Sequence, residues 1–348
     1  MSVPPIHWQP TAPLERLNLP WLAQAQVEVA VLRLDLIDTL ISGNKWFKLA
    51  HHLAAASDAG AQGVISLGGA HSNHLHALAA AGKRFGFATV GLLRGHRAQT
   101  PTIEDVQAFG MQLHWLGYGG YRARHEAGFW QLWLAQYPGF YPIPEGGGGV
   151  SGALGCAGLP SMVRDQLSHL GWDDYHGWWL AAGTGTTVAG LVLAEAGARP
   201  VYGAMAVPDD HGVAQSVAAI CGLPHYCGSE LCGSKLACES YFSGAKDASD
   251  VMASSRASSL PRELYSGADR DAYYLLSASR GGFAKTDPQL LAFITRSEAQ
   301  SGIPLEALYT GKALLALHDE VLGGRFSPGT RLIFVHTGGL QGRRGMGL

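Results

Sequence analysis

Two lysines in one short segment are the first residues whose type and spacing suggest chemistry. Lys45 and Lys48 lie one helical turn apart in the segment Ser42-Gly-Asn-Lys-Trp-Phe-Lys-Leu49, and the chain has only seven lysines. The macrodipole at a helix N-terminus disfavours a cation. The same field, together with partial burial, lowers the pKa of an amine and makes it a better nucleophile toward a carbonyl group. The segment therefore predicts a reactive lysine, with a surface lysine at a frayed helix start as the alternative.

A glycine- and threonine-rich loop between a predicted strand and a predicted helix is the second candidate. Such a loop directs successive backbone N–H groups and hydroxyls at one anionic group. It lacks the third glycine of a dinucleotide fingerprint and the Gly-Lys-Thr/Ser of a Walker A loop. A site for a single phosphate remains, or a tight turn with no ligand. The residues of this loop are Gly183, Thr184, Gly185, Thr186 and Thr187.

Three more strand-to-helix junctions carry polar residues. The segment Ser66-Leu-Gly-Gly-Ala-His-Ser-Asn-His74 puts Ser72 at the N-cap of a helix, and a cap needs no further role. A cap alone does not explain three further polar residues, His71, Asn73 and His74, at the same junction. Because open α/β sheets bind ligands at the carboxyl ends of their strands, these residues are candidates for a ligand site. The other two junctions are Leu308-Tyr-Thr-Gly-Lys312 and Arg331-Leu-Ile-Phe-Val-His-Thr-Gly-Gly339. A core aromatic is the alternative interpretation of Tyr309.

These junctions require alternating strands and helices, which the hydrophobic pattern predicts for most of the chain. Strands are expected at Val27–Leu36, Val64–Leu67, Ala88–Leu93, Gln112–Leu116, Trp178–Ala182, Val201–Ala206 and Arg331–His336. Helices are expected at Asn44–Ala59, His74–Arg84, Thr102–Phe109 and Gly311–Val321, with another running through Leu193. This βαβ order predicts parallel sheets with helices on both faces. The segment Tyr141–Gly149 is interpreted as a turn between two lobes, and Tyr226–Ser277 is weakly periodic and unassigned.

Composition excludes several classes of protein. The chain is 47% hydrophobic and 15% charged, which is unlike a disordered or fibrous protein. The formal net charge is −2, so the composition does not favour binding to nucleic acid or to an anionic membrane. No long apolar run or secretory signal pattern is present, and five cysteines are read as thiols, so we expect a soluble cytoplasmic protein. Four of these cysteines lack the spacing of structural zinc sites, so no metal site is expected.

Taken together, the junctions resemble the fold-type II pyridoxal-phosphate enzymes, in the family of 1-aminocyclopropane-1-carboxylate (ACC) deaminase and D-cysteine desulfhydrase. The resemblance covers most of the chain and rests on the order and spacing of its motifs. It implies two α/β lobes, each a mostly parallel sheet flanked by helices as in the tryptophan synthase β-subunit. Residues 1–50 and 160–348 would form the large cofactor-binding domain, and residues 51–159 the small one. The motifs are Gly43-Asn-Lys-Trp-Phe-Lys-Leu49, Gly68-Gly-Ala-His-Ser-Asn-His74, Tyr141-Pro-Ile-Pro-Glu-Gly-Gly147, Ser151-Gly-Ala-Leu-Gly155, Gly183 to Thr187, Leu308-Tyr-Thr-Gly-Lys312 and His336-Thr-Gly-Gly339.

The resemblance also implies roles for single residues. Lys45 resembles the lysine that holds pyridoxal 5′-phosphate as a Schiff base and later serves as a base. Lys48 would assist the loop Gly183–Thr187 at the phosphate. Asn73 would bond the 3′-oxygen of the cofactor, and Ser72 would meet the substrate carboxylate or take part in proton transfer.

Residues near the C-terminus complete the implied site and carry the departures from the family. Tyr309 would lie against the cofactor ring, and Thr310 would face the pyridine nitrogen, with Thr337 among the cofactor-binding residues. ACC deaminases resemble one another in having glutamate and leucine where this chain has Thr310 and Thr337, so the pair is desulfhydrase-like. Phe283 replaces a tyrosine that both branches tend to carry, and His71 replaces a common glutamine. The sequence after Gly339, Leu-Gln-Gly-Arg-Arg, also differs from the desulfhydrase pattern.

We therefore expect a pyridoxal-phosphate lyase or deaminase, of the lyase or hydrolase class, that acts on a small amino acid with D-stereochemistry. The expected products are a 2-oxo acid and ammonia, as for a D-cysteine desulfhydrase. ACC deaminase, a racemase with Ser72 and Lys45 on opposite sides of Cα, and a cofactor-binding protein without turnover are the alternatives. A homodimer is what the resemblance suggests.

Overall fold

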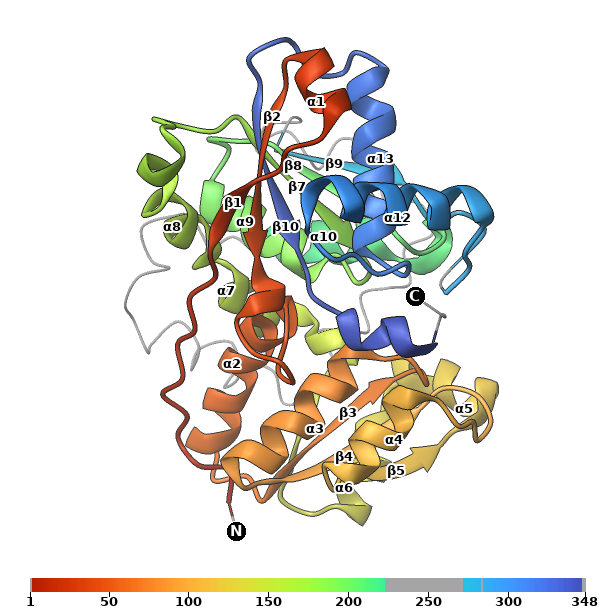
Figure 1. Ribbon diagram of the computed structural model, residues 1–348. Coiled ribbons are helices and arrows are strands. Elements are labelled where there is room, and N and C mark those ends of the chain that lie inside the picture. The colour runs from red at the N-terminus through yellow and green to blue at the C-terminus, as the bar shows by residue number, and fades with distance from the viewer. Residues whose placement is uncertain (1, 223–271, 283, 346–348) are drawn as a thin grey trace.

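The computed structural model describes residues 2–222, 272–282 and 284–345. Within them the chain forms two sheets, a six-stranded one in the upper part of Figure 1 and a four-stranded one in the lower part. The larger sheet has the order β1-β2-β10-β7-β8-β9, and only the pairing of β1 with β2 is antiparallel. Its strands are β1 (Leu14–Arg16), β2 (Glu28–Arg33), β7 (Gly177–Ala182), β8 (Val201–Met205), β9 (Tyr273–Ser277) and β10 (Arg331–His336).

Helices cover both faces of this sheet because its central strands are apolar on both sides. On one face, Trp178 and Ile333 pack with α7 (Gly149–Cys156), α8 (Leu159–Arg164), α9 (Thr186–Glu195) and α10 (Val213–Cys221). On the other face, Trp179 and Phe334 pack with α1 (Pro20–Ala25), α12 (Pro288–Ser301) and α13 (Thr310–Leu322). Continuous apolar strands of this kind are typical of buried parallel sheets.

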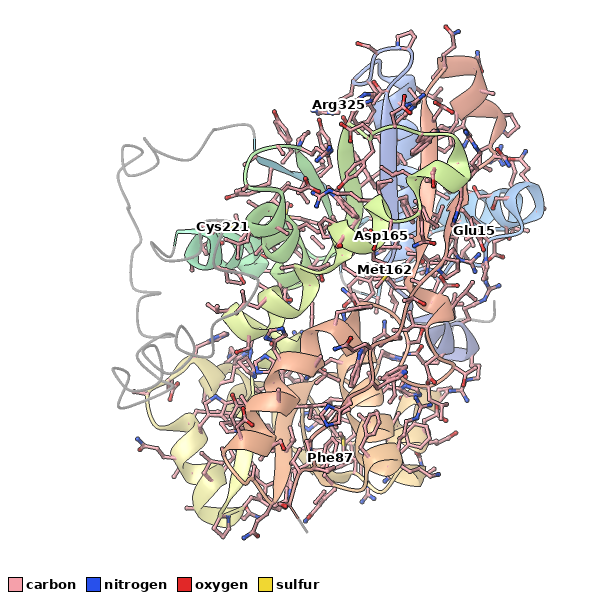
Figure 2. The ribbon with its side chains drawn as sticks, turned by 90° about the vertical axis from the view of Figure 1, so that its left-hand side faces the viewer. Glu15, Phe87, Met162, Asp165, Cys221 and Arg325 are labelled. Atoms are coloured by element: carbon pink, nitrogen blue, oxygen red, sulfur yellow. The ribbon has the colours of Figure 1, made fainter. Side chains whose placement is uncertain are left out.

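The smaller sheet has the order β5-β4-β3-β6, all parallel. Its strands are β3 (Gly63–Gly68), β4 (Ala88–Leu93), β5 (Gln112–Trp115) and β6 (Phe140–Ile143). Three helices pack on one face, α2 (Asn44–Asp58), α3 (Asn73–Phe85) and α4 (Pro101–Ala108), and α5 (Gly117–Arg122) and α6 (Phe129–Gln136) lie on the other. In Figure 2, Phe87 lies in this lower lobe and Met162 of α8 in the upper one.

Helix α2 joins the two lobes by packing closely on α7. Gly155 of α7 faces the backbone of Phe47 in α2, and a Cβ at that position would overlap the Phe47 carbonyl oxygen. The glycine therefore allows the two helices to approach more closely than any side chain would permit. This contact fixes the helix that carries Lys45 and Lys48 relative to the large sheet.

The structure confirms the predicted fold class and most of the predicted elements. The predicted strands Ala88–Leu93 and Arg331–His336 have the same ends as β4 and β10. The strand predicted at Val27–Leu36 is too long, because β2 ends at Arg33 and Leu34–Leu36 form the 3₁₀ helix η1. The boundary of the small domain at residues 51 and 159 stays a prediction.

One interpretation of the sequence was wrong. The start of the segment Tyr141–Gly149 is not turn but part of β6, which pairs with β3. Pro142 made this segment look like a loop, yet β6 is the last strand of its sheet, and an edge strand tolerates proline because one side of its backbone needs no partner.

The unassigned segment Tyr226–Ser277 lies outside the described residues except for its end, where β9 forms the last strand of the large sheet. Phe283 also lies outside the described residues, as do three of the four cysteines weighed as metal ligands. In the part of the chain that the structure describes, no helix is both long enough and apolar enough to cross a membrane.

Candidate active site

Lys45 is the second residue of α2 and lies partly buried between the two lobes. Its Nζ donates a hydrogen bond to Asn44 Oδ1 at 3.0 Å and lies 6.0 Å from the centre of the Tyr309 ring. Asn44 in turn donates from Nδ2 to Thr187 Oγ1 at 2.8 Å. Burial, with the neighbouring charge of Lys48 as the second cause, holds the pKa of Lys45 well below its usual value. A neutral amine at this position is both a nucleophile and a base.

The turn before Lys45 requires a glycine and a close approach of two backbone segments. Gly43 has a φ of +75°, and a Cβ there would overlap the Thr337 carbonyl oxygen. The same oxygen accepts a hydrogen bond from the Asn44 backbone N–H at 3.3 Å. Thr337, the residue after β10, therefore supports the start of α2 through its backbone carbonyl.

The glycine-threonine loop lies between β7 and the N-terminus of α9, beside Lys48. Lys48 Nζ donates to Thr184 Oγ1 at 3.3 Å and to the Gly146 carbonyl at 3.5 Å, and Thr184 Oγ1 lies 2.9 Å from Thr186 Oγ1. Burial lowers the pKa of Lys48 to about 8. No carboxylate of the described residues pairs with this buried ammonium. A buried cation and a helix N-terminus that face the same hydroxyls fit a phosphate group.

Tyr309 and Thr310 begin α13 on the other side of Lys45. A Cβ at Gly183 would lie 3.0 Å from Tyr309 Cε1, so this glycine leaves room for the ring. Burial and the charge of Glu306 raise the pKa of Tyr309, so its hydroxyl stays protonated. Thr310 Oγ1 accepts from the Glu306 backbone N–H and lies 3.0 Å from Glu306 Oε1.

Glu306 is a site residue that the sequence analysis missed. Its buried carboxylate accepts from the backbone N–H groups of Leu308, Tyr309 and Thr310, at 2.6, 2.9 and 2.6 Å. It therefore caps α13 from a position four residues before the helix begins. Burial raises the pKa of this carboxyl, and the bonds from Thr310 act in the opposite direction. An acidic residue just ahead of a predicted helix was the available signal.

Ser72 and Asn73 stand where α3 begins. Ser72 Oγ accepts from the Leu75 backbone N–H at 3.2 Å, which confirms the predicted N-cap. Asn73 Oδ1 accepts from Gln341 Nε2 at 2.9 Å. A Cβ at Gly339 would lie 2.5 Å from Asn73 Nδ2 and 3.6 Å from Glu306 Cγ, so Gly339 lies between Asn73 and the Glu306–Thr310 pair.

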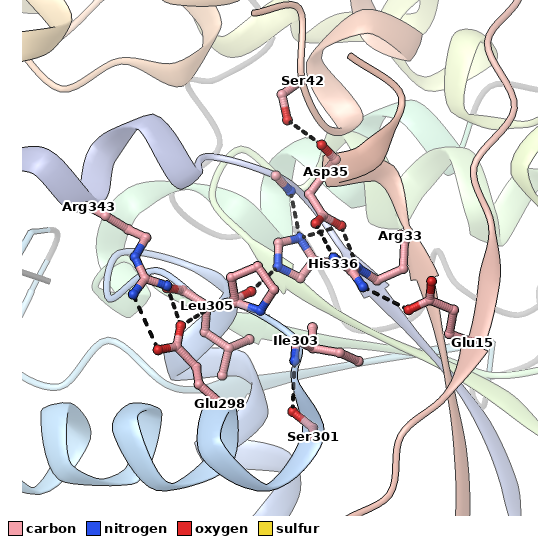
Figure 3. Close-up of polar contacts among 12 residues, drawn as sticks. Glu15, Arg33, Asp35, Ser42, Glu298, Ser301, Ile303, Leu305, His336 and Arg343 are labelled. Carbon is pink, nitrogen blue, oxygen red and sulfur yellow. Dashed lines mark hydrogen bonds and ion pairs between the residues drawn. The ribbon is translucent and has the colours of Figure 1, made fainter. Parts of the chain in front are cut away.

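A buried polar network beneath these residues was also missed by the sequence analysis (Figure 3). Asp35 accepts from Arg33 at 2.9 and 2.7 Å, and its Oδ1 lies 3.2 Å from His336 Nδ1. His336 bonds through Nε2 to the Pro304 carbonyl at 2.7 Å, and Ser42 Oγ donates to the Asp35 carbonyl at 3.4 Å. The network ties the segments before Lys45 and before Thr337 together. Charged residues inside a predicted buried strand were its signal in the sequence.

The structure thus gathers most of the predicted site residues around Lys45. Lys48 lies on α2 itself. The contacts above join α2 to the loop Gly183–Thr187, to Tyr309 and to Thr337. Three predicted residues have no described side-chain contact with Lys45 or α2. The hydrogen bond of Ser72 serves the cap, Asn73 bonds to Gln341, and Thr310 bonds to Glu306. His71 is partly buried beside Ser72.

Comparisons with known proteins bear on the family and the fold of the chain. The family model for pyridoxal-phosphate dependent enzymes matches residues 5–338. The chain is 25% identical over 349 residues to a bifunctional D-cysteine desulfhydrase/ACC deaminase of Arabidopsis thaliana, covering 95% of this chain and 76% of that one. It is 26% identical over 321 residues to an ACC deaminase assigned in Pyrococcus horikoshii, covering 90% and 85% of the two chains. The crystal structure of an ACC deaminase homologue matches 99% of this chain and 94% of its own with a TM-score of 0.70 and 22% identity, a likeness of fold.

Proposed function

The chain belongs to the pyridoxal-phosphate dependent enzyme family, and on that premise we propose that it is a lyase or deaminase that eliminates from a small D-amino acid, as a D-cysteine desulfhydrase does. The observation that carries the proposal is Lys45, an amine whose pKa burial holds well below its usual value, one helical turn from Lys48, which donates to Thr184 Oγ1 in the glycine-threonine loop at 3.3 Å. The hydrolase class that the sequence also allowed finds no support among the relatives.

The residues of this chain fit the cofactor. Lys48 presents a buried positive charge to the hydroxyls of Thr184 and Thr186 at the start of α9, and no carboxylate among the described residues is paired with it, which matches a phosphate. Lys45 would hold the aldehyde carbon of the cofactor, with Tyr309 against its ring and Thr310 toward its pyridine nitrogen. When bound, pyridoxal phosphate supplies an electron sink for negative charge at Cα of the amino acid.

The chain itself would bind, orient and move protons. The substrate carboxylate would meet the N-terminus of α3 at Ser72, where N–H groups favour an anion. Lys45, once its amine is free and neutral, would take the proton from Cα. With D-cysteine, the Cβ–S bond then breaks with its electron pair leaving on sulfur. Water finally replaces the nitrogen, so that the products are pyruvate, ammonia and hydrogen sulfide.

ACC deaminase activity is the second candidate, and one contact favours it. Thr310 stands where ACC deaminases have a glutamate, but the Glu306 carboxylate lies 3.0 Å from the Thr310 hydroxyl. A carboxyl group therefore lies within hydrogen-bond distance of the Thr310 hydroxyl. The names of the relatives cover both activities.

The test begins with the absorbance spectrum of the purified protein with added pyridoxal phosphate. We expect a visible band that borohydride reduction traps on Lys45, as peptide mapping would show, and that Lys45→Ala lacks. A substrate panel then separates the candidates: pyruvate and sulfide from D-cysteine, 2-oxobutyrate from ACC, inversion alone, or no reaction. A protein that stays colourless with the cofactor would refute the proposal.

A further inference from the structure

The segment after Gly339 differs from the desulfhydrase pattern, and the structure shows what it contacts. Residues Leu340–Gly345 form the short 3₁₀ helix η7, which follows β10 of the large sheet. In Figure 1 it is the dark blue turn between the two lobes, next to the C-terminus. It contacts α4 of the small lobe.

Two arginines hold η7 to both lobes. Arg343 donates to the Leu305 carbonyl at 2.9 Å and pairs with Glu298 of α12 (Figure 3). Arg344 pairs with Asp105 of α4, whose carboxylate lies 3.2 Å from His76 Nε2. The turn is therefore anchored on either side of the site, and the side chains between these anchors and Gly339 have defined positions.

Leu340 and Gln341 carry the side chains between Gly339 and these anchors, and the polar one, Gln341, has Asn73 as its partner. Gln341 Nε2 donates to Asn73 Oδ1 at 2.9 Å. A side-chain amide accepts through its oxygen and donates through its nitrogen, so reversing the Asn73 amide would set two N–H₂ groups against each other. On the other side, Asn73 Nδ2 lies so close to Gly339 that a Cβ there would be 2.5 Å away.

We propose that Gln341 is a positioning residue that fixes the Asn73 amide with its oxygen toward η7, so that its N–H₂ group is the end that meets the cofactor. The inference rests on the proposed function and on the role that the family resemblance implies for Asn73, at the 3′-oxygen of pyridoxal phosphate. A donor at an oxygen that carries negative charge stabilises that charge, whereas an amide oxygen in its place would repel it.

The experiment compares Gln341→Glu and Gln341→Met with the wild-type protein, each alone and combined with Asn73→Ala. Glutamate accepts but does not donate when ionised, so the Asn73 amide should turn its N–H₂ group toward η7. Gln300→Glu is the matched control, because Gln300 is an exposed glutamine on α12. The readouts are the dissociation constant for pyridoxal phosphate, the pH dependence of the visible band, and urea unfolding of the cofactor-free variants.

We expect Gln341→Glu to weaken cofactor binding by at least about tenfold and to shift the pH dependence of the band, with a smaller effect of Gln341→Met. Both effects should vanish in the Asn73→Ala background, since the inferred route runs through Asn73. Wild-type affinity and spectrum in both single variants would overturn the inference, and so would effects that persist in full without Asn73. If Gln341→Glu does not fold, Gln341→Met decides the matter by the same comparison. A wild-type protein that forms no visible band would instead refute the proposed function itself.

Discussion

Lys48 Nζ and Thr184 Oγ1 lie 3.3 Å apart, although 136 residues separate them in the chain. The contact brings a buried ammonium from α2 to the loop before α9. It joins two ordinary sequence features, a lysine near a helix start and a glycine-threonine turn, at the place where we propose that a phosphate binds.

The first prediction concerns the pH dependence of that site. Burial lowers the pKa of Lys48 to about 8, and a bound phosphate should raise it again. Phosphate therefore binds the form with a protonated lysine, so its dissociation constant should rise by up to about tenfold per pH unit above about pH 8. Calorimetric titration of the cofactor-free protein with inorganic phosphate between about pH 7 and pH 10 would measure this. Lys48→Met should remove the dependence, and an unchanged slope in that variant would assign the effect to another group.

The second prediction separates the two roles of Ser72. Ser72→Ala removes the N-cap and should lower the free energy of unfolding by about 1 kcal/mol, whereas Ser72→Asn keeps a capping oxygen and should be nearly neutral. If the hydroxyl also serves the substrate, both variants lose turnover. Urea unfolding and the steady-state rate, measured on the same preparations, distinguish the roles. Wild-type turnover in Ser72→Asn would show that Ser72 caps the helix and has no role toward the substrate.

The third prediction tests the Glu306–Thr310 pair. Thr310→Val keeps the shape of the side chain but leaves the Glu306 backbone N–H and carboxylate without their hydroxyl partner. The buried Glu306 N–H left unpaired should reduce the free energy of unfolding by about 1–3 kcal/mol, while the carboxylate keeps its three backbone donors. Thr310→Ser restores the hydroxyl and should recover most of the loss. Equal free energies of unfolding for Thr310→Val and Thr310→Ser in urea would show that the Glu306–Thr310 pair does not contribute to stability.

The fourth prediction concerns the approach of α2 and α7. Gly155→Ala places a Cβ against the Phe47 carbonyl oxygen, so the helices must separate. We expect a loss of about 1–3 kcal/mol in unfolding free energy, even though alanine favours a helix. Cofactor affinity should fall as well, since α2 carries Lys45 and Lys48. Gly158→Ala is the control, because a Cβ there meets nothing within 4 Å. Equal urea midpoints for the two variants would argue against tight packing at this crossing.

Much of the architecture could be predicted from the sequence because it is encoded locally. Strand β4 is a short apolar run, so its ends can be recognised from the neighbouring residues. Helix α3 has a serine N-cap and a glycine at its C-terminal end. The position of Lys45 next to the start of α2 also follows from local signals. The order of the junction motifs was specific enough to indicate the family.

Other features depended on which strands become neighbours. Proline in β6 signals a loop unless the strand lies at an edge, and only the sheet order places it there. Glu306 could be noticed only as an acid near a helix, since its three backbone partners depend on how the chain turns into α13.

The sequence by itself indicated the types of chemistry available: a lysine placed to have a lowered pKa, a glycine-threonine loop that could bind a phosphate, and a helix cap after a strand. The tertiary structure decided which of these meet. Parallel pairing brings the carboxyl ends of the strands to one edge of each sheet, and the segment after β10 of the large sheet contacts Asn73, at the start of the helix that follows β3 of the small one. The bond between Gln341 and Asn73 spans 268 residues, and no local pattern encodes it. Gln341 reaches Asn73 because it follows β10. The position of that strand is set by its backbone pairing with β2 and β7 and not by the residue types near Gln341.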